Sequence, residues 1–133
     1  MILSLPWENI GSPEVAREVK KSVFSLGYDS DLMSREADEL DYEFRFDWKV
    51  YGYQAVMMIK IDQNLKNLRE KITPDLVSEE DFWRNYFFEV EKILQDNNQP
   101  SRLRGRIDRA ERERKRLEAE ALLHSQPNQL LPS

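Results

Sequence analysis

The sequence lacks cysteine altogether and has a single histidine, His124. Without cysteine the chain can form neither a disulfide bond nor a thiolate metal site, which fits a reducing compartment. One histidine excludes metal sites built from several histidines and argues against a Ser/His nucleophile pair. The composition therefore argues against a function based on metal, redox or nucleophilic chemistry.

Long apolar runs and glycine-rich loops are missing as well. No apolar stretch approaches the roughly 18–20 residues that a membrane-spanning helix needs, and residues 1–5 lack the basic start of a signal peptide. The four glycines, Gly11, Gly27, Gly52 and Gly105, are scattered rather than gathered into a phosphate-binding loop. These absences predict a soluble intracellular protein with no membrane span.

Charge is unevenly distributed along the 133 residues, a length that suits one domain rather than two. Residues 1–100 carry 12 Lys/Arg and 20 Asp/Glu, for a net charge of −8. Residues 101–116 carry eight basic and three acidic side chains, for a net charge of +5. The sequence therefore predicts an acidic body followed by a basic segment.

A first helix is predicted over residues 13–26. Ser12 can cap it, Pro13 suits the first helical position, and apolar residues follow at helical spacing through Phe24. We expect Gly27 to end this helix in the left-handed conformation that glycine adopts readily.

Residues 42–50 fit two interpretations, because large apolar residues alternate with charged ones. By period alone they predict a half-buried strand. A lone strand would leave its backbone groups unpaired, so we expect an extended segment over residues 42–46 and a helix over residues 47–61, capped by Asp47. The apolar face of this helix would comprise Trp48, Tyr51, Ala55, Val56 and Ile59.

Asp62 either restarts this helix or continues it, and both alternatives stay open. Leu65, Leu68 and Ile72 then provide the apolar positions. Pro74 ends the helical segment, since the residue before a proline is pushed out of the α region.

Four large aromatic residues follow the next helix-start signal within six positions, and they form the most informative pattern in the chain. They are Phe82, Trp83, Tyr86 and Phe87. Ser78 can cap a helix over residues 78–96, and three acids in its first turn suit the helix dipole. We expect Phe82 and Trp83 to lie in the core, with the indole N–H of Trp83 near the surface beside a partner. An exposed recognition surface is the alternative.

Residues 101–124 have strong helix formers and almost no apolar face. Their candidate basic contact residues are Arg102, Arg104, Arg106, Arg109, Arg112, Arg114, Lys115 and Arg116. These side chains suit contact with phosphates of nucleic acid or of an anionic membrane. Acids are interleaved and no aromatic residue is present to stack on bases, so we expect a solvated helix with weak nucleic-acid contact. A coiled coil that forms with a partner is the alternative, along a seam containing Leu103, Ile107 and Leu117.

The order Phe82-Trp83-x-x-Tyr86-Phe87, preceded by an acidic helix start and by Thr73-Pro74, resembles the last helix of the BSD domain family. Leu5-Pro6-Trp7 and Phe44-Arg45-Phe46-Asp47 are similar to runs in the synapse-associated branch of that family. The resemblance covers about residues 3–96. Glu89 departs from the family pattern, because family members often carry a basic residue at this position.

The resemblance implies a compact three-helix bundle, which agrees with the all-α fold predicted from the periodicity. We expect a BSD domain over residues 1–99, a charged helical arm over residues 100–124, and a disordered tail over residues 125–133. The branch implies a non-enzymatic cytoplasmic adaptor, linked to kinase signalling, that binds a protein partner. The alternative is a nuclear BSD protein of transcription or repair that touches nucleic acid through its basic arm. No catalytic residue, cofactor or metal is expected.

Overall fold

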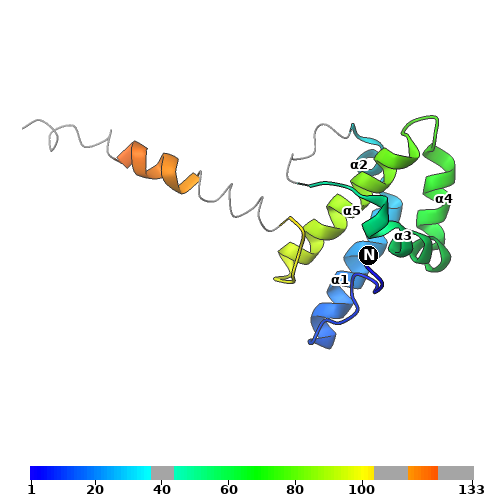
Figure 1. The fold of residues 1–133 in the computed structure, drawn as a ribbon, viewed down its shortest axis with the longest axis horizontal. Coiled ribbons are helices and arrows are strands. Elements are labelled where there is room, and N and C mark those ends of the chain that lie inside the picture. Colours follow the sequence, from blue (N-terminus) through cyan, green and yellow to red (C-terminus); the bar gives the residue numbers. More distant parts are fainter. Residues whose placement is uncertain (37–43, 104–113, 123–133) are drawn as a thin grey trace, which may run out of the picture.

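Within residues 1–36, 44–103 and 114–122, which the computed structural model describes, every regular element is helical. The order is α1 (Pro13–Ser25), the 3-10 helix η1 (Leu26–Tyr28), α2 (Ser30–Ser34), α3 (Trp48–Ile61), α4 (Gln63–Ile72) and α5 (Glu79–Asp96). Residues 114–122 form a further helical segment. The predicted all-α fold is confirmed, and Figure 1 shows α1 to α5 gathered into one bundle.

Each of the four longer helices begins at a short polar side chain that accepts a backbone N–H. The capping residues are Ser12, Asp47, Asp62 and Ser78. Asp62 ends α3 in an extended conformation and caps α4, so the helix restarts there instead of continuing. The predicted helix starts are confirmed because side-chain capping depends on residues only two or three positions apart.

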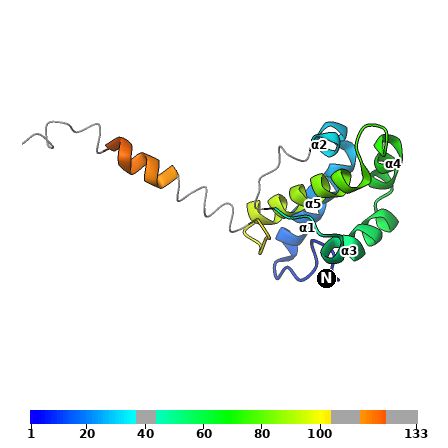
Figure 2. The same cartoon turned by 45° about the horizontal axis from the view of Figure 1, so that its top comes forward.

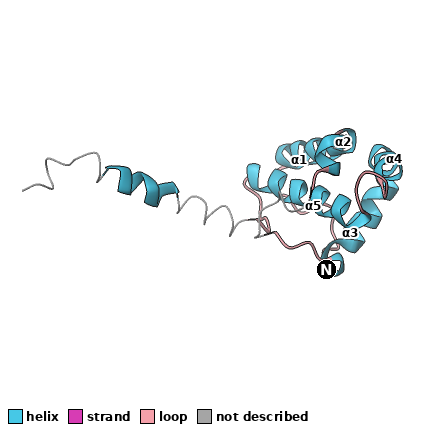
Figure 3. Ribbon diagram, turned by 90° about the horizontal axis from the view of Figure 1, so that it is seen from above, coloured by secondary structure: helices cyan, strands magenta, loops and turns pink. Residues whose placement is uncertain are grey.

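α5 is the central helix of the bundle. Figure 3 places it between α1 and α2 on one side and α3 on the other. Phe82, Tyr86 and Phe87 are completely buried, and Trp83 is 1% exposed, which confirms the prediction that the aromatic stripe faces the core. The Trp83 indole N–H donates to Glu79 Oε1 over 2.9 Å, as expected for a buried tryptophan at the edge of a core.

Stacked aromatic rings join α5 to α3. The rings of Tyr51 on α3 and Phe87 on α5 stack with 4.6 Å between their centroids. Within α5, Trp83 meets Phe82 edge to face at 5.1 Å. Residues 44–46 of the predicted extended segment have no regular structure, whereas residues 42–43 lie outside the described residues. Phe44 closes this cluster, with its ring 5.7 Å from that of Phe88.

The α2 helix is held on α5 by polar contacts. The Asn85 amide donates to the carbonyl oxygens of Met33 and Arg35 at 2.9 Å each. The Arg35 guanidinium donates to Glu89 Oε1 over 3.1 Å. Glu89 therefore has a structural partner directly after α2, although members of the family that the sequence resembles often carry a basic residue at its position.

Three local predictions are wrong: the left-handed conformation of Gly27, and the places of Trp48 and Val56 on the apolar face of α3, where Trp48 is 49% exposed. Gly27 lies in η1, and no described glycine has a positive φ. A Cβ on Gly27 would lie 2.9 Å from the Leu65 backbone nitrogen, so glycine is required by the close approach of η1 to α4. Val56 is 48% exposed, and Met58 is buried in its place on α3.

Residues 101–103 pack on the bundle. The Arg102 N–H donates to Glu91 Oε2 over 2.8 Å, and the Leu103 side chain is 2% exposed. The domain boundary after residue 99 stays a prediction, and this packing favours a boundary after residue 103. Of the predicted arm and tail, residues 104–113 and 123–133 lie outside the described residues.

Replacing Phe82 by alanine should lower the free energy of unfolding by about 3–5 kcal/mol, the range for truncating a buried phenylalanine. Urea unfolding followed by circular dichroism measures the change. Leu76→Ala is the control, because Leu76 is 67% exposed and its truncation should change stability by less than about 0.5 kcal/mol. Equal midpoints for the two variants would contradict the observed orientation of α5.

A chain ending at residue 103 should unfold cooperatively with nearly the stability of the full chain. A chain ending at residue 100 should still fold, but with a free energy of unfolding lower by about 2–3 kcal/mol, because Leu103 is no longer buried. Thermal unfolding of the two truncated chains tests this pair of expectations. Equal stability of both chains would show that Leu103 contributes nothing.

Candidate functional site

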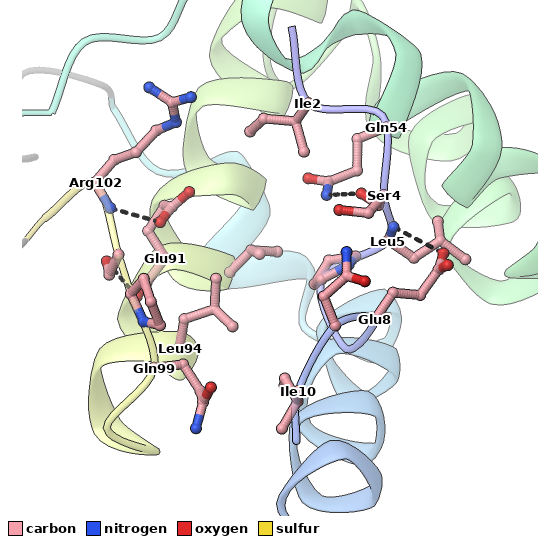
Figure 4. A pocket seen from close by; sticks show the side chains of 15 residues that line it. Ile2, Ser4, Leu5, Glu8, Ile10, Gln54, Glu91, Leu94, Gln99 and Arg102 are labelled. Carbon is pink, nitrogen blue, oxygen red and sulfur yellow. Dashed lines mark hydrogen bonds between the residues drawn. The ribbon is translucent and has the colours of Figure 1, made fainter. Parts of the chain in front are cut away.

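A concave cleft lies between the N-terminal residues and the second half of α5. Its volume is about 440 Å³. Its main apolar side chains are Ile2, Leu5, Ile10, Val90 and Leu94. Figure 4 shows Ile2, Leu5 and Ile10 on one side of the hollow and Leu94 of α5 on the other.

The N-terminal wall of the cleft is held by backbone contacts. The Ile2 N–H donates to the Val50 carbonyl over 2.8 Å, and the Leu5 N–H donates to Glu8 Oε1 over 2.9 Å. Figure 2 shows these residues running from the start of α3 toward the start of α1. The cleft is therefore preformed, because its N-terminal wall is hydrogen-bonded to α3.

Several polar groups of the cleft are already hydrogen-bonded within the protein. Gln54 is 4% exposed, and its amide Nε2 donates to the Ser4 carbonyl over 2.7 Å, while its Oε1 has no partner among the described residues. Glu91 Oε1 accepts from the Tyr51 hydroxyl and Oε2 from the Arg102 N–H. Such an arrangement can orient an apolar segment through Gln54 Oε1, whereas the carboxylates of Glu8 and Glu91 already accept hydrogen bonds and are poor candidates for a general base.

A second hollow of about 520 Å³ lies where α3 and α5 begin. We name it the aromatic–acidic notch after its lining residues, Phe46, Asp47, Trp48, Glu79, Glu80 and Trp83. The Trp48 and Trp83 rings meet edge to face with 6.3 Å between their centroids. Trp83 is buried, whereas Trp48 is 49% exposed, so Trp48 presents an aromatic face to solvent.

Among the residues that the structure describes, Tyr51, Asp62 and Tyr86 have clearly shifted pKa values, and all three belong to the core. Burial raises the pKa of Tyr51, and the neighbouring Glu91 charge raises it further. Burial also raises the pKa of Tyr86, with a smaller contribution from Asp62. Burial raises the pKa of Asp62 above 3.8, against the lowering effect of the N–H groups that it caps. Both tyrosines remain protonated near neutral pH. Tyr51 donates to Glu91, whereas the buried Tyr86 hydroxyl has no hydrogen-bond partner among the described residues.

Four of the eight predicted basic contact residues lie in the described part of the chain, on two separate segments. Arg102 lies on the body, with its guanidinium 5.6 Å from the Tyr51 ring centroid. Arg114, Lys115 and Arg116 are exposed on the helical segment 114–122. The remaining four candidates, Arg104, Arg106, Arg109 and Arg112, lie outside the described residues.

Metal-binding clusters and membrane-spanning helices are both absent from the described residues. Across residues 1–36, 44–103 and 114–122, no three His, Cys, Asp or Glu side chains are grouped so that they could hold a metal ion. In the same part of the chain, no helix has the length and apolar character needed to cross a membrane.

Sequence reasoning missed both hollows. The cleft joins Ile2, Gln54 and Leu94, which are far apart in the chain, and no local pattern connects them. The Leu5-Pro6-Trp7 run was the one local sign that the N-terminal residues pack on the bundle. The notch was missed because Trp48 was placed on the apolar face of its helix.

The comparisons with known proteins agree with the aromatic pattern of α5. A family model for the BSD domain matches residues 42–99, a range that contains α3, α4 and α5. Over 90 residues the chain is 31% identical to the "Synapse-associated protein of 47 kDa" of Drosophila melanogaster and 30% identical to "Synapse-associated protein 1" of Mus musculus. These alignments cover 68% of this chain, but 16% and 24% of the two relatives.

Asp62→Asn should remove part of the pH dependence of stability. Because the folded-state pKa of Asp62 is raised, the folded state binds this proton more tightly than the unfolded state does. The parent should therefore gain stability relative to the variant as the pH falls through the raised pKa toward the unfolded value of about 3.9. Urea unfolding at a series of pH values measures the difference, and a constant difference would contradict the expectation.

Proposed function

Residues 42–99 are a BSD domain, and from this premise we propose that the protein is a non-enzymatic adaptor that binds a protein partner. The observation that carries the proposal is the cleft beside α5. It is concave, largely apolar and preformed, as binding sites commonly are. Its one buried carboxylate, Glu91, is engaged through both oxygens, which suits recognition better than proton transfer.

The comparisons support the same direction. Neither the BSD domain nor the two synapse-associated relatives belongs to an enzyme family. In this chain the aromatic residues of the α5 signature are buried in the core. They stabilise the fold, and other residues form the surface that can contact a partner. A cytoplasmic location and a link to signalling are the parts of the proposal that rest on similarity to the synapse-associated branch.

The partner segment that best fits the cleft is extended and apolar. Ile2, Val90 and Leu94 offer apolar walls, and Gln54 Oε1 can accept one backbone N–H from the bound segment. The lining residues are drawn from the N-terminal residues, α3, α5 and residues 99–102 after α5, so the partner would bridge four parts of the chain.

The second candidate function is a nuclear BSD protein that contacts nucleic acid. Exposed Arg114, Lys115 and Arg116 favour it. Against it, Arg116 pairs with Glu120 at 2.8 Å, and residues 1–100 carry a net charge of −8 that repels phosphates. We therefore expect nucleic-acid affinity no tighter than the non-specific range of about 10⁻⁴–10⁻⁶ M.

Capture of partners from cell extract by the full chain tests the proposed function. Leu94→Glu places a charge in the cleft wall and should abolish capture of a specific protein. Val56→Glu is the matched control, because Val56 is half-exposed on α3 and does not line the cleft. Circular dichroism of both variants checks that they remain folded. Capture that survives Leu94→Glu would contradict the role of the cleft.

Nucleic-acid binding separates the two functions. Reversing Arg114, Lys115 and Arg116 to glutamate should leave the captured protein bound. DNA or RNA affinity should fall with salt by about −0.9 in log–log slope for each phosphate contacted on a duplex. Sub-micromolar binding at physiological salt that the triple reversal abolishes would favour the nuclear alternative instead.

A further inference from the structure

We propose that the aromatic–acidic notch is a second binding site, which accepts an arginine or lysine side chain from a basic segment of a partner protein. The notch shares no lining residue with the cleft, so this inference goes beyond the function proposed for the cleft. The notch combines an exposed aromatic ring in a fixed position with three carboxylates that line the same hollow, and the surrounding body is acidic.

The aromatic part of the notch is preorganised. The Trp48 ring lies over Gly52, where an added Cβ would approach the indole Nε1 to 3.0 Å. Its other neighbours are the Trp83 ring and the Phe46 ring, the latter 6.1 Å away between centroids. A ring held in this way loses little side-chain freedom when a ligand binds, and its exposed face attracts a cation.

The acidic part of the notch retains free acceptor capacity. Asp47 Oδ1 caps α3, Glu79 Oε1 accepts from Trp83 and Arg69, and Glu80 Oε1 accepts from Arg84. In each carboxylate the second oxygen has no partner among the described residues. These three side chains therefore offer three oxygens around an aromatic face, which is the chemistry that guanidinium and ammonium groups recognise.

The neighbouring arginines do not fill the notch. Arg69 and Arg84 pair with its acids but do not line it, and the Glu80 side chain is 70% exposed. Exposed pairs of this kind contribute little and can exchange partners. The positive end of the α5 dipole is offset by Glu79, Glu80 and Asp81 in its first turn. The local field therefore remains favourable to an incoming cation.

Charge complementarity selects a basic partner segment as the occupant. Residues 1–100 carry a net charge of −8, which attracts a cationic segment and repels an anionic one. An apolar segment would bury the second oxygen of each carboxylate without a hydrogen-bond donor, which is costly. A basic side chain can make a cation–π contact with the ring and donate hydrogen bonds to the carboxylates at the same time.

The test is a nuclear magnetic resonance titration of the full chain, labelled with nitrogen-15, using blocked tetra-arginine and tetra-lysine peptides as probes. We expect saturable shifts at the Trp48 indole N–H and at the backbone of Glu80, which weaken as salt is added. Blocked tetra-glutamate should cause no such shift. Trp7, which lies outside the notch, provides an internal control signal.

Matched variants make the outcome decisive. Trp48→Ala should weaken tetra-arginine binding by about three- to tenfold, and Glu80→Gln should weaken it several-fold. Tyr53→Ala is the control for Trp48, because Tyr53 is 44% exposed on the same helix and does not line the notch. Leu94→Glu in the cleft should not weaken peptide binding, so failure of the cleft and failure of the notch are distinguishable.

Three results would overturn the proposal. The first is peptide binding that Trp48→Ala leaves unchanged. The second is an equal response to tetra-glutamate. The third is a shift of the Trp48 signals when Arg114, Lys115 and Arg116 are reversed to glutamate with no peptide present, which would assign the notch to the chain's own basic segment.

Discussion

The stacked contact between α5 and α3 is the interaction on which the rest of the structure depends. Tyr51 of α3 lies on Phe87 of α5, and Trp83 extends the same cluster toward the start of both helices. This contact positions the residues at both ends of the interface between α3 and α5. At one end Tyr51 donates to Glu91 beside the cleft, and at the other Trp83 supports Trp48 in the notch. Both candidate binding surfaces are therefore consequences of one aromatic core.

Buried polar groups give this core a defined arrangement. Aromatic packing alone tolerates small rotations of a helix, whereas a buried amide or carboxylate requires particular partners. Asn85 binds two carbonyl oxygens of the α2 region, and Glu91 binds groups from α3 and from residue 102. These contacts set the rotation of α5, and with it the side chains that reach the cleft.

The two hollows differ in chemistry, which suits a module that recognises two features of a partner. The cleft has apolar walls and the amide oxygen of Gln54, whereas the notch has an exposed tryptophan face and three carboxylates. Apolar burial supplies most of the affinity in such contacts, and charge complementarity supplies orientation and association rate. A partner that carries an apolar segment and a basic segment would use both surfaces of the same bundle.

Local sequence determined where the helices begin, because capping by Ser12, Asp47 and Ser78 involves residues two or three positions away. It also determined which side of α5 is buried, since a dense aromatic stripe leaves no other stable arrangement. The aromatic order further identified the family. These features were predictable because their causes lie within a few turns of one helix.

The tertiary structure alone decided the binding surfaces. The close approach of Gly27 to α4, the exposure of Trp48 and the packing of Leu103 each depend on a neighbour far away in the chain. Periodicity can assign a residue to a helix face, but it cannot show whether another element covers that face. Coverage depends on how separate helices meet, and for that reason the cleft and the notch became visible only in the folded bundle.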